Sequence, residues 1–303
     1  ALRGRQERLT RFEEADPCGP HGSELPEGRE QVVITDDGAE LAVLVAGPDD
    51  GPTVVLVHCW TGRSSFWATV ARRLVLAGHR VVLYDQRGHG LSTPGDLAPS
   101  IDAIGNDLHA VLTAVDARDA VLVGHSMGGM TIQSYAALHH EDFVARAKAV
   151  VLVATAARVL GRPVPARIIE ALMGDQRADW SRRGWVGRAT TRRSLGKVAR
   201  SAHIDATLQG FAETSGAARA GFLHAMAGMD LRAGLGDIAV PTTVLVGTHD
   251  LLTPPRLARQ LVDAIPGSTL VLLPGAGHML PLEEPDRIVD AIRSIAHPGV
   301  SAP

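Results

Sequence analysis

Short apolar runs alternate with amphipathic stretches along most of this chain. Val and Leu dominate the runs, which are too short for helices and are bounded by Gly and polar residues, so they predict strands. We expect strands at 31–36, 40–46, 53–58, 80–84, 119–124, 148–153, 241–247 and 269–274. Helical spacing predicts helices near 64–77, 100–116, 127–140, 256–265 and 284–297. Because strands buried on both faces read as continuous apolar runs, the pattern predicts an α/β fold with a mostly parallel central sheet flanked by helices.

The alternation of strands and helices stops after Ala154. Residues 155–236 carry helical patterns without convincing strands, and the alternation then returns. The chain is therefore expected to have three parts: a polar N-terminal arm at 1–30, a core domain at 31–154 and 237–303, and a helical lid or cap at 155–236. The cap is inserted after the sixth strand of the core sheet.

Composition excludes several classes of protein. The 303 residues are 45% apolar and 21% charged, which is typical of a soluble globular protein. The net charge of −3 gives no reason to expect a nucleic-acid partner. No apolar run approaches the roughly 20 residues that span a bilayer. The chain starts at Ala1, which is compatible with an upstream segment having been removed, so a cytoplasmic and an exported location both stay open, as does the oligomeric state.

Neither metal nor cofactor binding is expected. No cluster of His, Cys, Asp and Glu has the spacing of metal ligands. The glycines at 88–90 do not form a phosphate-binding motif behind a strand. The two cysteines, Cys18 and Cys59, provide no framework of disulfides, and the sequence leaves open whether they are bonded to each other.

A serine between glycines follows one of the predicted strands. Residues 124–129 read Gly-His-Ser-Met-Gly-Gly, and a helical pattern begins directly after Ser126. The G-x-S-x-G pattern is that of a nucleophile elbow, a tight turn in which bulky side chains at the glycine positions would clash. The turn exposes the serine hydroxyl at a helix N-terminus, where backbone N–H groups favour developing negative charge. We predict that Ser126 is a nucleophile.

A serine hydroxyl needs a base, and the base needs a group that orients it. One predicted strand is followed by Asp250, four residues before Pro254, and the last strand is followed by a glycine-rich loop that ends at His278. The order Ser, Asp, His is that of the α/β-hydrolase triad. We predict His278 as the base and Asp250 as its orienter, in preference to a role for Asp250 as a helix N-cap.

With these motifs the sequence resembles the α/β-hydrolase superfamily over residues 31–297. Two further segments agree: His58-Cys-Trp-Thr-Gly62 is similar to the family's His-Gly-X loop, and Asp85-Gln-Arg-Gly-His-Gly-Leu-Ser92 is similar to its D-x-R-G-x-G-x-S turn. The resemblance implies the α/β-hydrolase fold and an acyl-transfer reaction at serine. It does not identify the substrate, because this fold supports many reactions.

The resemblance also implies an oxyanion hole. Its donors would be the backbone N–H groups of Met127, which follows the nucleophile, and of Trp60, whose indole would also form a wall of the pocket. Cys59 stands where the family usually has glycine, so the loop can follow a different path, and Cys59 is the alternative donor.

The predicted cap is rich in arginine. A solvated helical surface explains this composition, and so does attraction to an anionic membrane surface or an acidic substrate; the sequence does not decide between them. The cap is expected to supply much of the acyl pocket, with Phe222 and Met226 among the lining residues.

The leading functional hypothesis is a serine hydrolase, of the esterase or lipase type, that cleaves a small carboxylic ester or a lipid through an acyl-enzyme. A cofactor-free perhydrolase of the haloperoxidase type and a C–C bond hydrolase would use the same triad. A non-catalytic ligand binder is disfavoured, because binding alone does not need all three groups. Branches with an aspartate nucleophile are disfavoured, because position 126 is a serine.

Overall fold

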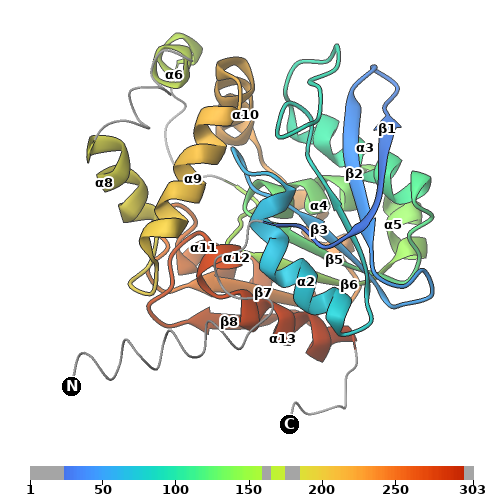
Figure 1. Ribbon diagram of the computed structural model, residues 1–303. Helices are drawn as coiled ribbons and strands as arrows, with labels where there is room; N and C mark the ends of the chain where they lie inside the picture. Colours follow the sequence, from blue (N-terminus) through green and yellow to red (C-terminus); the bar gives the residue numbers. More distant parts are fainter. Residues whose placement is uncertain (1–23, 159–164, 175–184, 297–303) are drawn as a thin grey trace.

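The computed structural model describes residues 24–158, 165–174 and 185–296. Eight strands form one sheet, shown in Figure 1. The strands are β1 (Gly28–Ile34), β2 (Glu40–Ala46), β3 (Thr53–Val57), β4 (Arg80–Tyr84), β5 (Ala120–His125), β6 (Ala147–Val153), β7 (Thr242–Gly247) and β8 (Thr269–Leu273). Their order across the sheet is β1-β2-β4-β3-β5-β6-β7-β8. β2 is antiparallel to both neighbours and all other pairs are parallel, so the predicted fold class is confirmed.

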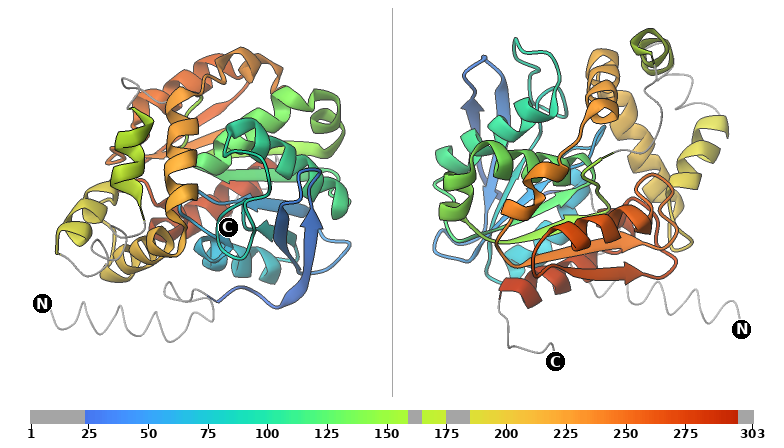
Figure 2. Two further views of the ribbon diagram at one scale, coloured as in Figure 1. Left: turned by 90° about the horizontal axis from the view of Figure 1, so that it is seen from above. Right: turned by 180° about the vertical axis from the view of Figure 1, so that it is seen from behind.

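Helices connect the parallel strands and cover both faces of the sheet (Figure 2). In chain order the helical elements are η1 (Ser64–Trp67), α2 (Ala68–Leu76), α3 (Ile101–Ala114), α4 (Met127–Leu138), α5 (His140–Arg146), α6 (Ala166–Met173), α8 (Trp185–Ser194), α9 (Ser201–Glu213), α10 (Gly216–Gly228), η2 (Arg232–Asp237), α11 (Pro255–Ala264), α12 (Leu280–Glu283) and α13 (Pro285–Ala296). The predicted core elements differ from these bounds by a few residues. One element extends into the predicted arm, because β1 begins at Gly28.

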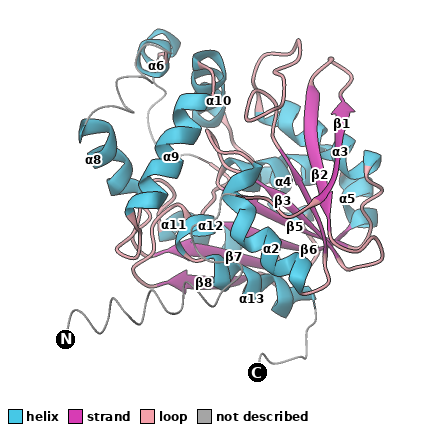
Figure 3. Ribbon diagram, viewed as in Figure 1, coloured by secondary structure: helices cyan, strands magenta, loops and turns pink. Residues whose placement is uncertain are grey.

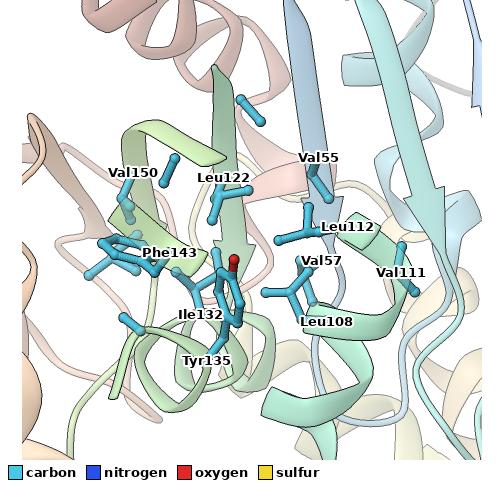
Figure 4. Close-up of a cluster of buried hydrophobic side chains, with 14 of the residues drawn as sticks. Val55, Val57, Leu108, Val111, Leu112, Leu122, Ile132, Tyr135, Phe143 and Val150 are labelled. Carbon is cyan, nitrogen blue, oxygen red and sulfur yellow. The ribbon is translucent and has the colours of Figure 1, made fainter. Parts of the chain in front are cut away.

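The continuous apolar runs are explained by burial on both faces of the sheet. Along β3, Val54 and Leu56 point into a cluster with α2 and α13, while Val55 and Val57 point into the opposite cluster with α3 and α4. Figure 4 shows this second cluster, in which Leu108 and other side chains of the helices pack against the strands. Alternating side chains therefore reach two cores, and neither face can be polar.

The helices α6, α8, α9 and α10 lie between β6 and β7 in the sequence and beyond one edge of the sheet in space (Figure 3). They fall within residues 155–236, and the division of the chain into a core and a cap stays a prediction. On α6, Ile169 is buried and Ile168 is 43% exposed. Consecutive helical residues differ by about 100° in direction, so the two side chains cannot share one face.

Two further observations concern the described residues. Cys59 is a free, buried cysteine, and Cys18 lies outside the described residues, so the question of a bond between them is not addressed. Within the described ranges, no helix is long and apolar enough to cross a membrane, and no group of His, Cys, Asp and Glu side chains is arranged to hold a metal ion.

Candidate active site

Ser126 occupies a strained turn between β5 and α4. Its φ of 53° and ψ of −115° lie in a region that non-glycine residues rarely adopt. A Cβ atom at Gly124 or Gly128 would overlap neighbouring backbone atoms, so both positions require glycine. The turn is held by its own backbone: the Ser126 N–H donates to the Val153 carbonyl at 2.9 Å, and the Thr155 hydroxyl donates to the Ser126 carbonyl at 2.6 Å.

The imidazole of His278 lies between the serine hydroxyl and a carboxylate. His278 Nε2 is 3.0 Å from Ser126 Oγ, and His278 Nδ1 is 2.8 Å from Asp250 Oδ2. Because a carboxylate accepts, Nδ1 carries the proton in the neutral ring and Nε2 is left to accept the serine proton. All three side chains are more than nine-tenths buried. The structure thus brings together the three residues that the sequence singled out after β5, β7 and β8.

Asp250 is held by the residues that follow it. Its Oδ1 accepts the N–H groups of Leu252 at 2.8 Å and Thr253 at 2.9 Å, and its Oδ2 accepts the Thr253 hydroxyl at 2.7 Å. Burial alone would raise the pKa of Asp250, but the interaction with His278 and the bonds from Thr253 outweigh it and lower the pKa. The carboxylate therefore stays charged beside the imidazole, where it stabilises an imidazolium.

A buried network fixes the loop that follows β3. The ring of His58 contacts the Cys59 carbonyl through Nδ1 at 2.8 Å and accepts the Gln86 N–H through Nε2 at 2.9 Å. The Gln86 amide donates to the His58 carbonyl, and the Thr131 hydroxyl of α4 donates to the Gln86 amide oxygen, both at 2.6 Å. Burial lowers the pKa of His58, so its ring stays neutral and serves as a structural link. The network ties the loop of Trp60 to the helix that begins at the nucleophile.

The two predicted oxyanion donors, Trp60 and Met127, come from the loop after β3 and from the start of α4. Trp60 lines the same cavity as Ser126, and Met127 is the first residue of α4. Within the described part of the chain, no hydrogen bond engages the backbone N–H of either residue. Cys59 is buried beside them, and burial raises the pKa of its thiol to about 12. Its sulfur therefore stays protonated and is a poor nucleophile.

His125, which precedes the nucleophile, contacts the loop of the catalytic imidazole. Its Nε2 donates to the His278 carbonyl at 2.8 Å, and the two rings are 5.2 Å apart. Burial and the neighbouring His278 lower the pKa of His125 to about 3, so the ring is neutral. His125 holds the loop of His278 through the carbonyl of that residue, and it does not line the cavity.

A cavity of about 370 Å³ opens at Ser126 and His278. The helices between β6 and β7 supply most of its wall. Its larger apolar lining residues are Trp60, Met130, Leu208, Phe211, Leu223, Met226, Leu252 and Met279. Thr190, Thr191, Ser194 and Thr207 line another part. Among the described residues, no Asp, Glu, Lys or Arg lines this cavity, so its wall matches a neutral, largely apolar group.

The two cap residues predicted to line the pocket behave differently. Met226 lines the cavity, but Phe222 does not. Phe222 is 1% exposed and packs in a cluster with Ile104 and Met127, with its ring 5.4 Å from that of His89. The reason is helical geometry: Leu223 and Phe222 differ by about 100° in direction on α10, and Met226 lies between them, so it contacts both the cavity and the buried cluster, whereas Phe222 packs in the cluster alone. The prediction for Phe222 is therefore wrong.

A fully buried arginine organises the aromatic part of the wall. The Arg219 guanidinium donates to the carbonyls of Met173 and Phe211, both at 2.8 Å, and of Thr214, and it lies 4.8 Å above the Phe211 ring. Phe211 meets the Trp60 indole edge to face at 6.2 Å, and the indole N–H donates to the Arg219 carbonyl at 3.1 Å. Arg219 thus links α6, α9 and α10 to the loop after β3.

Some lining and supporting residues were not predicted from the sequence. Leu208 and Phe211 share one face of α9, and helical spacing would have grouped them. Thr253 stands between Asp250 and Pro254, and its position beside a predicted acid was a usable signal. Nothing in the local sequence indicated that a buried Arg219 would lie behind the pocket, because its position depends on how α6, α9 and α10 pack together.

The basic character of the cap is only partly described. Several of its arginines, including Arg182, lie outside the described residues. Of the others, Arg188 pairs with Asp205, and Arg192 donates to the carbonyls of Leu195 and Gly196. Contact with an anionic membrane surface stays a prediction.

Comparison with known proteins identifies the class. A sequence model of the family described as "Serine aminopeptidase, S33" matches residues 49–286. The esterase EaEST from Exiguobacterium antarcticum has a TM-score of 0.78 and 22% identity, covering 88% of this chain and 99% of that one, which supports the fold. The fold and these matches define an α/β hydrolase. Within that superfamily, the chain belongs to the serine aminopeptidase family whose model it matches.

Two curated relatives span nearly the whole fold. Bifunctional esterase/perhydrolase DCH of Acinetobacter calcoaceticus is 27% identical over 268 residues, which are 84% of this chain and 95% of that protein. Non-heme chloroperoxidase CPO-A1 of Kitasatospora aureofaciens is 27% identical over 267 residues, which are 84% of this chain and 94% of that protein.

Proposed function

We propose that this protein is a serine hydrolase that cleaves small, neutral carboxylic esters through an acyl-enzyme on Ser126. The observation that carries the proposal is the unbroken line from Ser126 Oγ through the His278 imidazole to Asp250, at the wall of a cavity. A serine, an imidazole and a buried carboxylate at these distances form the constellation that activates a hydroxyl for acyl transfer.

In the first half of the reaction, the Ser126 oxygen attacks the ester carbonyl while His278 Nε2 takes the serine proton. Asp250 keeps the imidazole in the required tautomer and stabilises its charged form. The negative charge that develops on the carbonyl oxygen is stabilised by the N–H groups of Met127 and Trp60, which have no competing acceptor within the described residues. His278 then protonates the leaving alcohol. In the second half, His278 activates a water that releases the acid and restores the serine.

The cavity supports a restricted substrate class. Its apolar wall of Trp60, Phe211 and Leu223 suits an uncharged acyl group, and about 370 Å³ is small for a long chain. We further propose that residues 155–236 form a cap that provides this wall. The products of ring cleavage that C–C hydrolases accept are carboxylates, and the described lining offers no cation to bind them.

Perhydrolysis is the second candidate. The relative from Acinetobacter calcoaceticus is named for both esterase and perhydrolase activity. Hydrogen peroxide would replace water as the nucleophile toward the same acyl-enzyme, and a peracid would be released. The two candidates share every residue of the first half-reaction and differ in which nucleophile is accepted in the second.

A single panel tests both candidates. p-Nitrophenyl esters from acetate to palmitate are assayed beside a fluorophosphonate label, and peracid formation is measured from acetate and hydrogen peroxide. Ester hydrolysis that peaks at short or medium chains, with labelling lost in Ser126→Ala, supports the proposal. Efficient peracid formation with slow ester turnover would favour the second candidate, and labelling unchanged in Ser126→Ala would overturn both.

A further inference from the structure

A second buried carboxylate lies next to the catalytic imidazole without touching it. Glu283, at the end of α12, is 8% exposed. Its Oε2 accepts the N–H groups of Gly196 at 2.6 Å and Gly277 at 2.9 Å, and its Oε1 accepts the N–H of Met279 at 3.0 Å. Two of these donors flank His278, and the third belongs to the segment between α8 and α9.

The same two segments are also joined directly. The His278 N–H donates to the Ser194 carbonyl at 2.8 Å, and the Lys197 N–H donates to the Gly275 carbonyl at 2.7 Å. A Cβ at Gly196 would overlap the backbone of residues 275–277, so the approach depends on the absence of a side chain there. We name this set of contacts between residues 194–197, residues 275–279 and Glu283 the cap–base joint.

The joint connects specificity with chemistry. Ser194 lines the cavity and holds the backbone of His278 through its carbonyl. Every backbone N–H from Gly277 to Met279 is engaged, two by Glu283 and one by Ser194. A general base needs its ring placed to a fraction of an ångström, and a shift of about 1 Å can cost about 100-fold in rate.

Glu283 is suited to this task by its two oxygens. Three N–H donors converge on one carboxylate, and the N–H groups from 196 and 277 share a single oxygen. Burial raises the pKa of Glu283, while the three N–H donors act in the opposite direction by stabilising the charged form. Asp250 binds the reacting imidazole itself, whereas Glu283 binds only main chain.

We propose that Glu283 is a positioning residue that fastens residues 194–197 of the cap to the loop of His278, so that cap docking and orientation of the base are one event. The inference rests on the proposed role of His278 as the general base. It assigns a function in turnover to a carboxylate that contacts neither substrate nor nucleophile.

The first test is Glu283→Gln. A carboxamide has one oxygen, so its NH₂ must face either Met279 N–H or the pair from Gly196 and Gly277. We expect kcat for p-nitrophenyl acetate, per site titrated to completion with fluorophosphonate, to fall by about 10- to 100-fold, with KM changed much less. Glu284→Gln, which neutralises the adjacent half-buried carboxylate, should stay within about twofold of wild type because no hydrogen bond to the described residues uses that side chain.

The second test approaches the joint from the cap. Gly196→Ala places a methyl group against the 275–277 backbone without altering any triad residue. It should lower kcat for the same small ester, and the double variant with Glu283→Gln should lose far less than the product of the two single effects, because both open the same joint.

The positioning role of Glu283 and the proposed hydrolase function of Ser126 can fail independently. The positioning role would be overturned if either single variant kept the wild-type kcat per titrated site, or if the two effects multiplied in the double variant. If Glu283→Gln yields no titratable sites, the kcat of Gly196→Ala decides in the same way. Ester turnover that persists in Ser126→Ala would instead overturn the proposed function, whatever the result at Glu283.

Discussion

The carboxyl ends of the strands and the helices between β6 and β7 contribute different residues to the same cavity: the strand ends contribute the proposed catalytic groups, and the helices contribute much of the wall. The groups proposed for chemistry, Ser126, Asp250 and His278, follow β5, β7 and β8 and are placed by backbone turns at the ends of neighbouring strands. Much of the apolar lining comes from side chains of α9 and α10, and α8 adds threonine and serine residues. A strand end fixes a side chain through the sheet's hydrogen bonds, whereas a helix offers one face whose side chains can change without moving the triad. This division predicts that side chains of α9 and α10 can alter specificity without altering the chemistry, whereas the cap–base joint couples the two regions.

Two buried arginines show the same contrast. In the core, Arg87 donates to Asp37 and Asp107, with distances from 2.6 to 2.9 Å, and fixes the turn after β4. Among the helices between β6 and β7, Arg219 of α10 donates to carbonyls at the ends of helices and stacks on Phe211. The first arginine holds a turn in the core, and the second holds the wall of the cavity.

The largest effect is expected from the core side. Asp250→Asn removes the charge that stabilises the imidazolium and allows the wrong tautomer of His278, so kcat should fall by about 10³- to 10⁴-fold. The lowered pKa of Asp250 means that its carboxylate stays charged under mild acidification, so a pH of 5 should not reproduce the effect of the substitution at this residue. Ester turnover across pH 5 to 9 measures both effects. Asp263→Asn, an exposed site on α11, is the matched control, and a loss under tenfold at Asp250 would remove it from the triad.

Adjacent residues of α10 give the sharpest separation of packing from specificity. Phe222→Ala should destabilise the fold by about 3–5 kcal/mol, because it empties a fully buried site, while leaving the ratio of kcat/KM for decanoate and butyrate esters unchanged. Leu223→Ala should cost less stability and raise that ratio by about tenfold, because it enlarges the cavity.

Urea unfolding and the two esters provide the measurements for this pair. Phe222→Leu keeps most of the volume and serves if the alanine variant unfolds. A shifted chain-length ratio at Phe222 and an unchanged one at Leu223 would reverse the assignment of the two faces of α10.

Arg219 should affect stability and the KM for long esters more than it affects kcat. Arg219→Lys loses the planar fork that reaches several carbonyls, and we expect a destabilisation of about 1–3 kcal/mol and a raised KM for the longer esters. kcat for acetate should change by less than about threefold, because the triad is held by other elements. Arg188→Lys, at an exposed ion pair, is the control. Equal losses in kcat for both esters would break the proposed division.

The smallest effect is a pH dependence in the core. The hydrogen bonds from Arg87, and then those from Thr35 and Leu97, lower the pKa of Asp37 against the opposing effect of burial. A carboxyl with a lowered folded pKa stabilises the protein above its unfolded pKa of about 4 and loses that contribution as the pH falls further. Asp37→Asn should therefore cost about 2 kcal/mol in urea unfolding at pH 7 and progressively less below pH 4. The exposed Asp36→Asn should show neither effect, and a difference for Asp37 that grows on acidification would contradict the sign.

The predictability of each part from the sequence follows from how local its determinants are. The strands were predictable, because burial on both faces of the sheet leaves a continuous run of apolar residues. The elbow at Ser126 was predictable, because a turn that excludes side chains leaves glycines at fixed positions. Phe222 was misplaced, because a run of apolar residues on α10 does not reveal which face meets the core. The roles of Glu283 and Arg219 could not be predicted, because each also binds a residue tens of positions away, Gly196 for Glu283 and Met173 for Arg219.

The central claim is that an acyl group is carried on Ser126, and trapping that intermediate tests it most directly. The protein is mixed with excess p-nitrophenyl butyrate, quenched in acid within milliseconds, digested and weighed by mass spectrometry. The account predicts a butyryl group on the peptide that contains Ser126, released with the same rate constant as turnover, and no adduct in Ser126→Ala. A butyryl group found on another residue, or the same adduct in Ser126→Ala, would contradict it.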